Sequence, residues 1–78
     1  MSNVEKLAKV FADTFGISVD QTAGLVDQGI EAWDSVGHMT LVAAIEDSFG
    51  IMLDTDDIID MSSFEKAQEI LKKYDVEF

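Results

Sequence analysis

Apolar residues recur along the chain at the three- and four-residue spacing of amphipathic helices, while runs that alternate apolar and polar residues are short. This spacing predicts an all-α protein. The first helix is predicted over residues 3–15. Ser2 and Glu5 fit a capping box at its start, and Gly16 is suited to the left-handed conformation that ends a helix. One apolar stripe runs along this helix: Val4, Leu7, Ala8, Phe11 and Phe15.

Residues 17–34 do not fit a single helix, because their apolar positions are irregular. A connection this long without structure is unusual, so we expect it to be functional or to be anchored by its own apolar side chains. Ile17 and Leu25 are the expected anchors. A turn of helix is expected near Asp20.

The second helix is predicted over residues 35–49, with Asp34 as its N-cap and Gly50 as its stop. Its apolar residues form two stripes: Leu41, Val42, Ile45 and Phe49 make up one, and Val36, Met39 and Ala43 make up the other. A helix that is apolar on more than one face is either central to a bundle or offers part of its surface to a partner.

The last third of the chain predicts two further helices. Asp54 should cap a short helix over residues 55–60, and Ser62 with Glu65 should form the capping box of a final helix over residues 63–74. Five residues of that helix have core spacing: Phe64, Ala67, Ile70, Leu71 and Tyr74. The predicted fold class is therefore an all-α four-helix bundle. It has three longer helices, one short helix and a long loop between the first two.

Length and composition favour one small domain spanning residues 1–78. With 47% apolar residues, 78 residues should fold to an accessible surface of about 4,700 Å². Cysteine is absent, which excludes disulfides and thiolate metal sites. No apolar run approaches the roughly 20 residues of a membrane span, and the N-terminus lacks a signal-peptide pattern. We expect a cytoplasmic monomer without an integral membrane segment.

The charge balance indicates which partners the chain can bind. Five Lys or Arg residues against 16 Asp or Glu residues give a net charge of −11. Nucleic acid is excluded as a direct ligand, because neutralising phosphates needs clustered basic side chains. The expected partners are proteins with basic patches, attracted over a long range. The alternative is that acidity only keeps a small protein in solution.

The segment from Trp33 to Met39 is the most informative for chemistry. Ser35 falls in the first turn of a helix directly after the long loop, where its hydroxyl is accessible. A phosphate attached there would face unpaired backbone N–H groups and the positive end of the helix dipole. The segment thus suits a phosphodiester. The alternative is that Asp34 and Ser35 are ordinary capping residues.

The Asp34-Ser35 pair, followed by an apolar residue, resembles the attachment motif of acyl carrier proteins and peptidyl carrier domains. The resemblance extends over essentially the whole chain, because the long loop, the acidic pair Glu46-Asp47 and the short third helix also fit. It implies that Ser35 carries 4′-phosphopantetheine, transferred from coenzyme A by a separate phosphopantetheinyl transferase. The thiol of this arm would hold an acyl or aminoacyl group as a thioester, and the protein would not be an enzyme.

Three positions depart from the pattern of carriers in general fatty acid biosynthesis. Where those carriers have Leu, Asp and Glu, this chain has Val36, Gly37 and Thr40. The Gly37-His38 pair is more similar to carriers of specialised polyketide, nonribosomal peptide or modified-lipid pathways. Two alternatives stay open: a D-alanyl or other aminoacyl carrier paired with an adenylating ligase, and a small acidic calcium-binding or adaptor protein without a cofactor.

The resemblance also implies a partner-binding surface next to Ser35. The expected partners are the transferase, a loading ligase and downstream synthase enzymes with basic docking patches. The apolar part of this surface is predicted to be Val36, Met39, Thr40 and Ala43. Its acidic part is predicted to be Glu46, Asp47, Asp56 and Asp57.

The Ser35/His38 spacing and Trp33 each have a structural interpretation. Ser35 and His38 could suggest a nucleophile with its base, but the G-x-S-x-G elbow and a residue to orient the histidine are missing. We therefore predict no catalytic residue, and expect His38 to pack near the loop or at the base of the arm. Trp33 is expected in the core, closing the loop over the second helix; the alternative is a contact with the arm or a partner.

Residues 54–65 resemble a calcium loop in part. Asp54, Asp56 and Glu65 match ligand positions of that template, but Ile58 and Ile59 stand where a ligand and a glycine are needed. We therefore predict a short helix here and no metal site.

Overall fold

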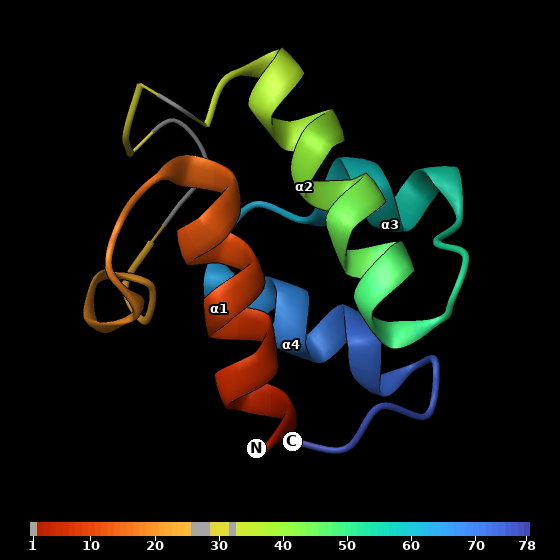
Figure 1. The fold of residues 1–78 in the computed structure, drawn as a ribbon. Helices are drawn as coiled ribbons and strands as arrows, with labels where there is room; N and C mark the ends of the chain where they lie inside the picture. The colour runs from red at the N-terminus through yellow and green to blue at the C-terminus, as the bar shows by residue number, and fades with distance from the viewer. Residues whose placement is uncertain (1, 26–28, 32) are drawn as a thin grey trace.

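The computed structural model describes residues 2–25, 29–31 and 33–78. Figure 1 shows helices packed around a common core, with no β-strand among the described residues. The all-α prediction is confirmed. The elements follow in the order α1 (Asn3–Phe15), η1 (Val19–Gln21), α2 (Ser35–Phe49), α3 (Thr55–Asp60) and α4 (Phe64–Lys72).

The predicted bounds of α1, its Ser2 cap and its Gly16 stop are confirmed, but the Glu5 carboxylate accepts from the Ser2 hydroxyl and not from the backbone N–H that a capping box requires. The Ser2 hydroxyl accepts a hydrogen bond from the backbone N–H of Glu5 at 3.2 Å, and Gly16 has a φ of 68°. One residue of the predicted stripe is wrong: Val4 is 39% exposed, whereas Val10 and Ala12 are buried. The buried face is wider than one stripe because α1 packs against both α2 and the loop that contains η1.

The loop after α1 is anchored as predicted. Leu25 is buried, Ile17 packs against the core, and the helical turn of η1 includes Asp20. The carbonyl of Leu25 also accepts a hydrogen bond from the backbone N–H of Phe64 at 2.9 Å. This bond ties the loop to the first residue of α4.

Helix α2 begins and ends at the predicted residues. The Asp34 carboxylate accepts from the backbone N–H of Gly37 at 2.7 Å, and Gly50 ends the helix with a φ of 66°. Leu41, Val42 and Ile45 are buried in the core. The start of α2 lies at the end of the molecule opposite to the two termini (Figure 1).

The two C-terminal helices need small corrections. Asp54 precedes α3 as predicted, but its side chain makes no capping hydrogen bond. The cap of α4 is Ser63 rather than Ser62: its hydroxyl accepts from the backbone N–H of Lys66 at 2.9 Å. Helix α4 starts at Phe64 because the chain is still extended at Ser63, and it ends at Lys72.

The core is built from α1, α2 and α4 and the connecting segments, and Ile58 of α3 packs against it. Its largest fully buried side chains include Trp33, Phe11, Leu7, Leu41, Ile45, Met61 and Leu71. The accessible surface is 4704 Å², in line with the about 4,700 Å² expected for one compact domain of this length. Within the described part of the chain, each helix is too short or too polar to cross a bilayer.

Candidate functional site

Ser35 is the first residue of α2 and is exposed. The preceding Asp34 fixes this end of the helix twice, because its carboxylate accepts from Gly37 and its carbonyl accepts from the backbone N–H of His38 at 2.8 Å. The hydroxyl of Ser35 therefore sits on a rigid helix N-terminus, where the backbone N–H groups and the dipole favour an anionic substituent.

A surface hollow of about 480 Å³ lies beside this serine. The loop before α2 supplies most of its lining, and Ser35 is the one lining residue within α2. The lining residues are Gly29, Ile30, Glu31, Trp33, Asp34 and Ser35. A group attached to Ser35 thus has open space next to it.

The second apolar stripe of α2 is not covered by the bundle. At 100° per residue, its members lie on the side of the helix opposite to Leu41 and Ile45. Val36 is 76% exposed and Met39 is 57% exposed. Five residues on this side of the helix are exposed, and we call them the exposed stripe of α2: Val36, Met39, Thr40, Ala43 and Asp47. The bundle therefore leaves this mostly apolar face of α2 exposed.

The predicted acidic positions divide into two groups. Asp47 and Asp56 are exposed and available to a partner. Glu46 is half-buried, and its carboxylate accepts a hydrogen bond from the backbone N–H of Leu53 at 2.8 Å. Glu46 therefore holds the connection between α2 and α3 in addition to carrying charge.

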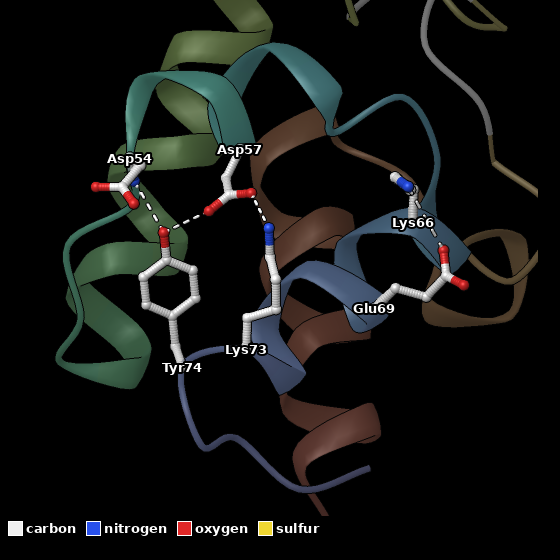
Figure 2. Close-up of polar contacts among 6 residues, drawn as sticks. All are labelled: Asp54, Asp57, Lys66, Glu69, Lys73 and Tyr74. Atoms are coloured by element: carbon white, nitrogen blue, oxygen red, sulfur yellow. Dashed lines mark hydrogen bonds and ion pairs between the residues drawn. The ribbon is translucent and has the colours of Figure 1, made fainter.

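Asp57 differs from its prediction as a docking residue, because it is only 5% exposed. Figure 2 shows its carboxylate between two residues that follow α4. The ammonium of Lys73 forms an ion pair with Oδ1, and the hydroxyl of Tyr74 donates to Oδ2 at 2.5 Å. The Tyr74 hydroxyl also accepts from the backbone N–H of Asp54 at 2.9 Å. We call Asp57, Lys73 and Tyr74 the α3–α4 clasp.

The clasp keeps Asp57 ionised. The hydrogen bond from Lys73, followed by that from Tyr74, lowers the pKa of Asp57 below its ordinary value. The same contacts with Asp57 raise the pKa of Lys73 and of Tyr74. Because Lys73 neutralises Asp57 locally, the pair offers a basic partner no net charge. The core spacing of Tyr74 in the sequence indicates that its hydroxyl needs a hydrogen-bond partner inside the fold. The spacing does not show that this partner is Asp57.

Trp33 and His38 form a connection that the sequence did not predict. Trp33 is fully buried, as expected, and its indole N–H donates to Nδ1 of His38 at 2.9 Å. Nε2 of His38 lies 2.7 Å from the carbonyl oxygen of Ile58 in α3. The histidine thus packs near the loop as expected, but it has an orienting partner. Both ring nitrogens are engaged, so neither serves as a base for Ser35.

The partial calcium loop is not formed. Asp54 is the N-cap position of α3, Ile58 and Ile59 are helical, and Ile59 is 72% exposed. Among the described residues, no three potential ligand side chains gather closely enough to hold a metal ion.

No protein-family model matches the sequence, and no curated protein or solved structure matches it significantly. The resemblance to carrier proteins therefore rests only on the residues of this chain, and a carrier function is a proposal.

Proposed function

We propose that this protein is a carrier protein that holds acyl or aminoacyl groups as thioesters on a 4′-phosphopantetheine arm attached to Ser35. The observation that carries the proposal is the position of Ser35: an exposed hydroxyl on the first residue of a 15-residue helix, directly after the Asp34 cap and beside an open hollow. The resemblance of the Asp34-Ser35 motif supplies the identity of the arm.

The attachment would be a phosphoryl transfer. The Ser35 oxygen forms a bond to the phosphorus of the pantetheine phosphate in coenzyme A, and the bond from that phosphorus to the bridging oxygen breaks. The adenosine 3′,5′-bisphosphate part of coenzyme A leaves, and a base of the transferase takes the hydroxyl proton. In the product, the phosphodiester charge lies at the N-terminus of α2, where the helix dipole stabilises it.

The rest of the surface fits a protein that is handled by other enzymes. The exposed stripe of α2 begins next to Ser35 and ends at Asp47, and Asp56 adds charge from α3. Basic residues around the mouth of a transferase, ligase or synthase active site would pair with these carboxylates. In this proposal the protein acts as a cytoplasmic monomer in a specialised polyketide, nonribosomal peptide or modified-lipid pathway, or as an aminoacyl carrier served by an adenylating ligase.

The test is modification with coenzyme A and a broad-specificity phosphopantetheinyl transferase, followed by intact mass measurement. Wild type should gain one phosphopantetheine, and Ser35→Ala should gain none. Ser62→Ala is the matched control, because Ser62 is an exposed serine that does not cap a helix. Ser35→Ala should keep its Tm, since Asp34 retains the cap. A modified Ser35→Ala variant, or an unmodified wild type, would contradict the proposal; calcium binding by the unmodified protein would then favour the adaptor alternative.

A further inference from the structure

The connection through His38 joins three parts of the molecule: the loop that precedes Ser35, the first turns of α2, and α3. Trp33 belongs to the loop, His38 to the first turns of α2, and Ile58 to α3. Ser35 lies between Trp33 and His38 in the chain. We call Trp33, His38 and the carbonyl of Ile58 the tether.

Each end of the tether has a fixed chemical role. An indole N–H can only donate, so Nδ1 of His38 must be the acceptor and its hydrogen must be on Nε2. Nε2 then donates to the carbonyl of Ile58. A single neutral tautomer therefore satisfies both bonds. The Ile58 carbonyl is one of the last four of α3, which have no partner within the helix, so His38 caps the C-terminal end of α3.

The Trp33 end of the tether is rigid. The indole is fully buried, stacks on Phe15 with a centroid distance of 5.2 Å and meets Phe11 edge to face at 5.4 Å. The imidazole plane lies 13° from the indole plane. The buried indole of Trp33 therefore fixes the orientation of the His38 ring through their hydrogen bond. Helix α3 has only six residues, which is too short to hold a position by its own helical hydrogen bonds.

We propose that His38, oriented by Trp33, is a positioning residue that fixes α3 against the Ser35 end of α2, and thereby determines how well the enzyme that modifies Ser35 binds. This inference rests on the proposed function for its kinetic consequence. Val36 and Met39 are exposed on the first turns of α2, and the exposed Ile59 directly follows Ile58, the residue of α3 that His38 holds to these turns. The clasp holds α3 to the end of α4, and Glu46 holds the segment before α3, whereas the tether links α3 to the first turns of α2. Loss of the tether therefore loosens α3 specifically at the Ser35 end of α2.

The experiment compares three variants in the transferase reaction and in amide hydrogen exchange of the unmodified protein. His38→Phe keeps an aromatic ring but removes both hydrogen bonds. His38→Gln keeps an acceptor and a donor at a similar spacing in its carboxamide. Val42→Ala is the matched control, because Val42 is a buried residue of α2 outside the tether. His38→Met replaces His38→Phe if the phenylalanine variant does not fold.

His38→Phe should raise the KM for the carrier about fivefold with kcat unchanged, since about fivefold corresponds to the net loss of one hydrogen bond, the His38–Ile58 bond that holds α3. Its α3 amides should exchange faster than those of wild type. His38→Gln should restore both properties. Val42→Ala should lower the Tm while leaving KM and α3 exchange as in wild type.

A wild-type KM in His38→Phe, or an equal rise in KM in Val42→Ala, would overturn the inference. A raised KM with unchanged α3 exchange would also overturn it, because His38 would then contact the transferase directly. If wild type is not modified at all, the proposed function fails, and α3 exchange in His38→Phe and His38→Gln decides the positioning role by itself.

Discussion

At the scale of single residues, Asp57 shows that an acidic side chain in an acidic protein can be structural. Its two carboxylate oxygens are bonded to Lys73 and Tyr74, sixteen and seventeen residues away. The neighbouring Asp56 is exposed. Two adjacent aspartates on one short helix therefore have opposite roles: Asp57 holds α3 to the end of α4, and Asp56 contributes surface charge.

Replacing Asp57 tests the clasp. Asp57→Asn leaves the Lys73 ammonium without its ion-pair partner and weakens the acceptor for the Tyr74 hydroxyl, so we expect the Tm to fall by several degrees. Asp56→Asn removes the same charge from the same helix and is the control; its Tm should stay level or rise, because repulsion is reduced. Thermal unfolding followed by circular dichroism measures both. Equal Tm values for the two variants would argue against the clasp.

The difference in Tm between wild type and Asp57→Asn should depend on pH, because the pKa of Asp57 is lowered in the folded protein. A carboxyl group whose pKa is lower in the folded protein than in the unfolded chain stabilises the fold above its unfolded pKa, about 3.8 here. This contribution is lost as the pH falls through the lower, folded pKa. The Tm gap between wild type and Asp57→Asn should thus be constant from pH 7 to about pH 4 and close at more acid pH. A gap that persists at the lowest pH would contradict the assignment.

At the scale of elements, α2 performs two tasks with its two faces. One face supplies Leu41, Val42 and Ile45 to the core, and the other carries the exposed stripe that starts beside Ser35. The acidic residues at its far end are not equivalent, because Glu46 also holds the backbone of Leu53. Charge changes that probe docking should therefore spare Glu46.

The docking role of the α2 and α3 surface can be tested with Asp47→Lys combined with Asp56→Lys. Opposite charges on carrier and enzyme speed association at low salt, so the double variant should be loaded about tenfold more slowly there, with a flatter salt dependence. Glu65→Lys with Glu69→Lys on α4 makes the same charge change and is the control. Loading rates of both variants, measured from low to physiological salt, provide the comparison. If they slow equally, net charge alone accounts for the effect.

Met39→Glu probes the apolar part of the same surface. Met39 is 57% exposed and lies in the exposed stripe, so its replacement should leave the fold intact. An apolar contact mainly sets the dissociation rate, whereas charges at the rim mainly set the association rate. The variant should therefore raise KM without flattening the salt dependence. Wild-type KM in Met39→Glu would place the partner contact elsewhere.

At the scale of the whole molecule, charge is segregated. The five lysines lie in or directly after α1 and α4, and residues 10–65 contain none. Helices α2 and α3 therefore have no lysine or arginine of their own. The Ser35 end of α2 belongs to this acidic part of the molecule. A basic partner would be oriented toward it before contact.

The net charge of −11 should also limit stability at low salt. The molecule measures 30 × 28 × 19 Å, and the screening length is about 30 Å at 0.01 M salt but about 8 Å at 0.15 M. At low salt nearly all carboxylates repel one another. Added NaCl should raise the Tm, MgCl₂ at equal ionic strength should raise it at least as much, and mild acidification should raise it before Asp57 is protonated. An unchanged Tm in both salts would show that repulsion is unimportant.

The sequence alone determined the helices and their ends where the decisive contacts are local. Asp34 caps α2 by accepting from the backbone N–H three residues further on, and Gly16 and Gly50 end their helices through their own backbone conformation. The apolar period likewise identified most of the core, because it depends only on spacing along one helix. Ser35 could be placed at a helix N-terminus for the same reason, and this position carries the functional proposal.

Only the tertiary structure decided which residues pair between elements. The clasp of Asp57 with Lys73 and Tyr74, and the bond from His38 to Ile58, join residues sixteen to twenty positions apart. Helical spacing gives the face on which a side chain lies, but not the angle at which two helices meet. Two side chains can share a hydrogen bond only once that angle has brought their atoms within about 3 Å. For this reason Asp57 could be taken for a docking residue and the orienting partner of His38 could be missed, until the packing of α2, α3 and α4 was known.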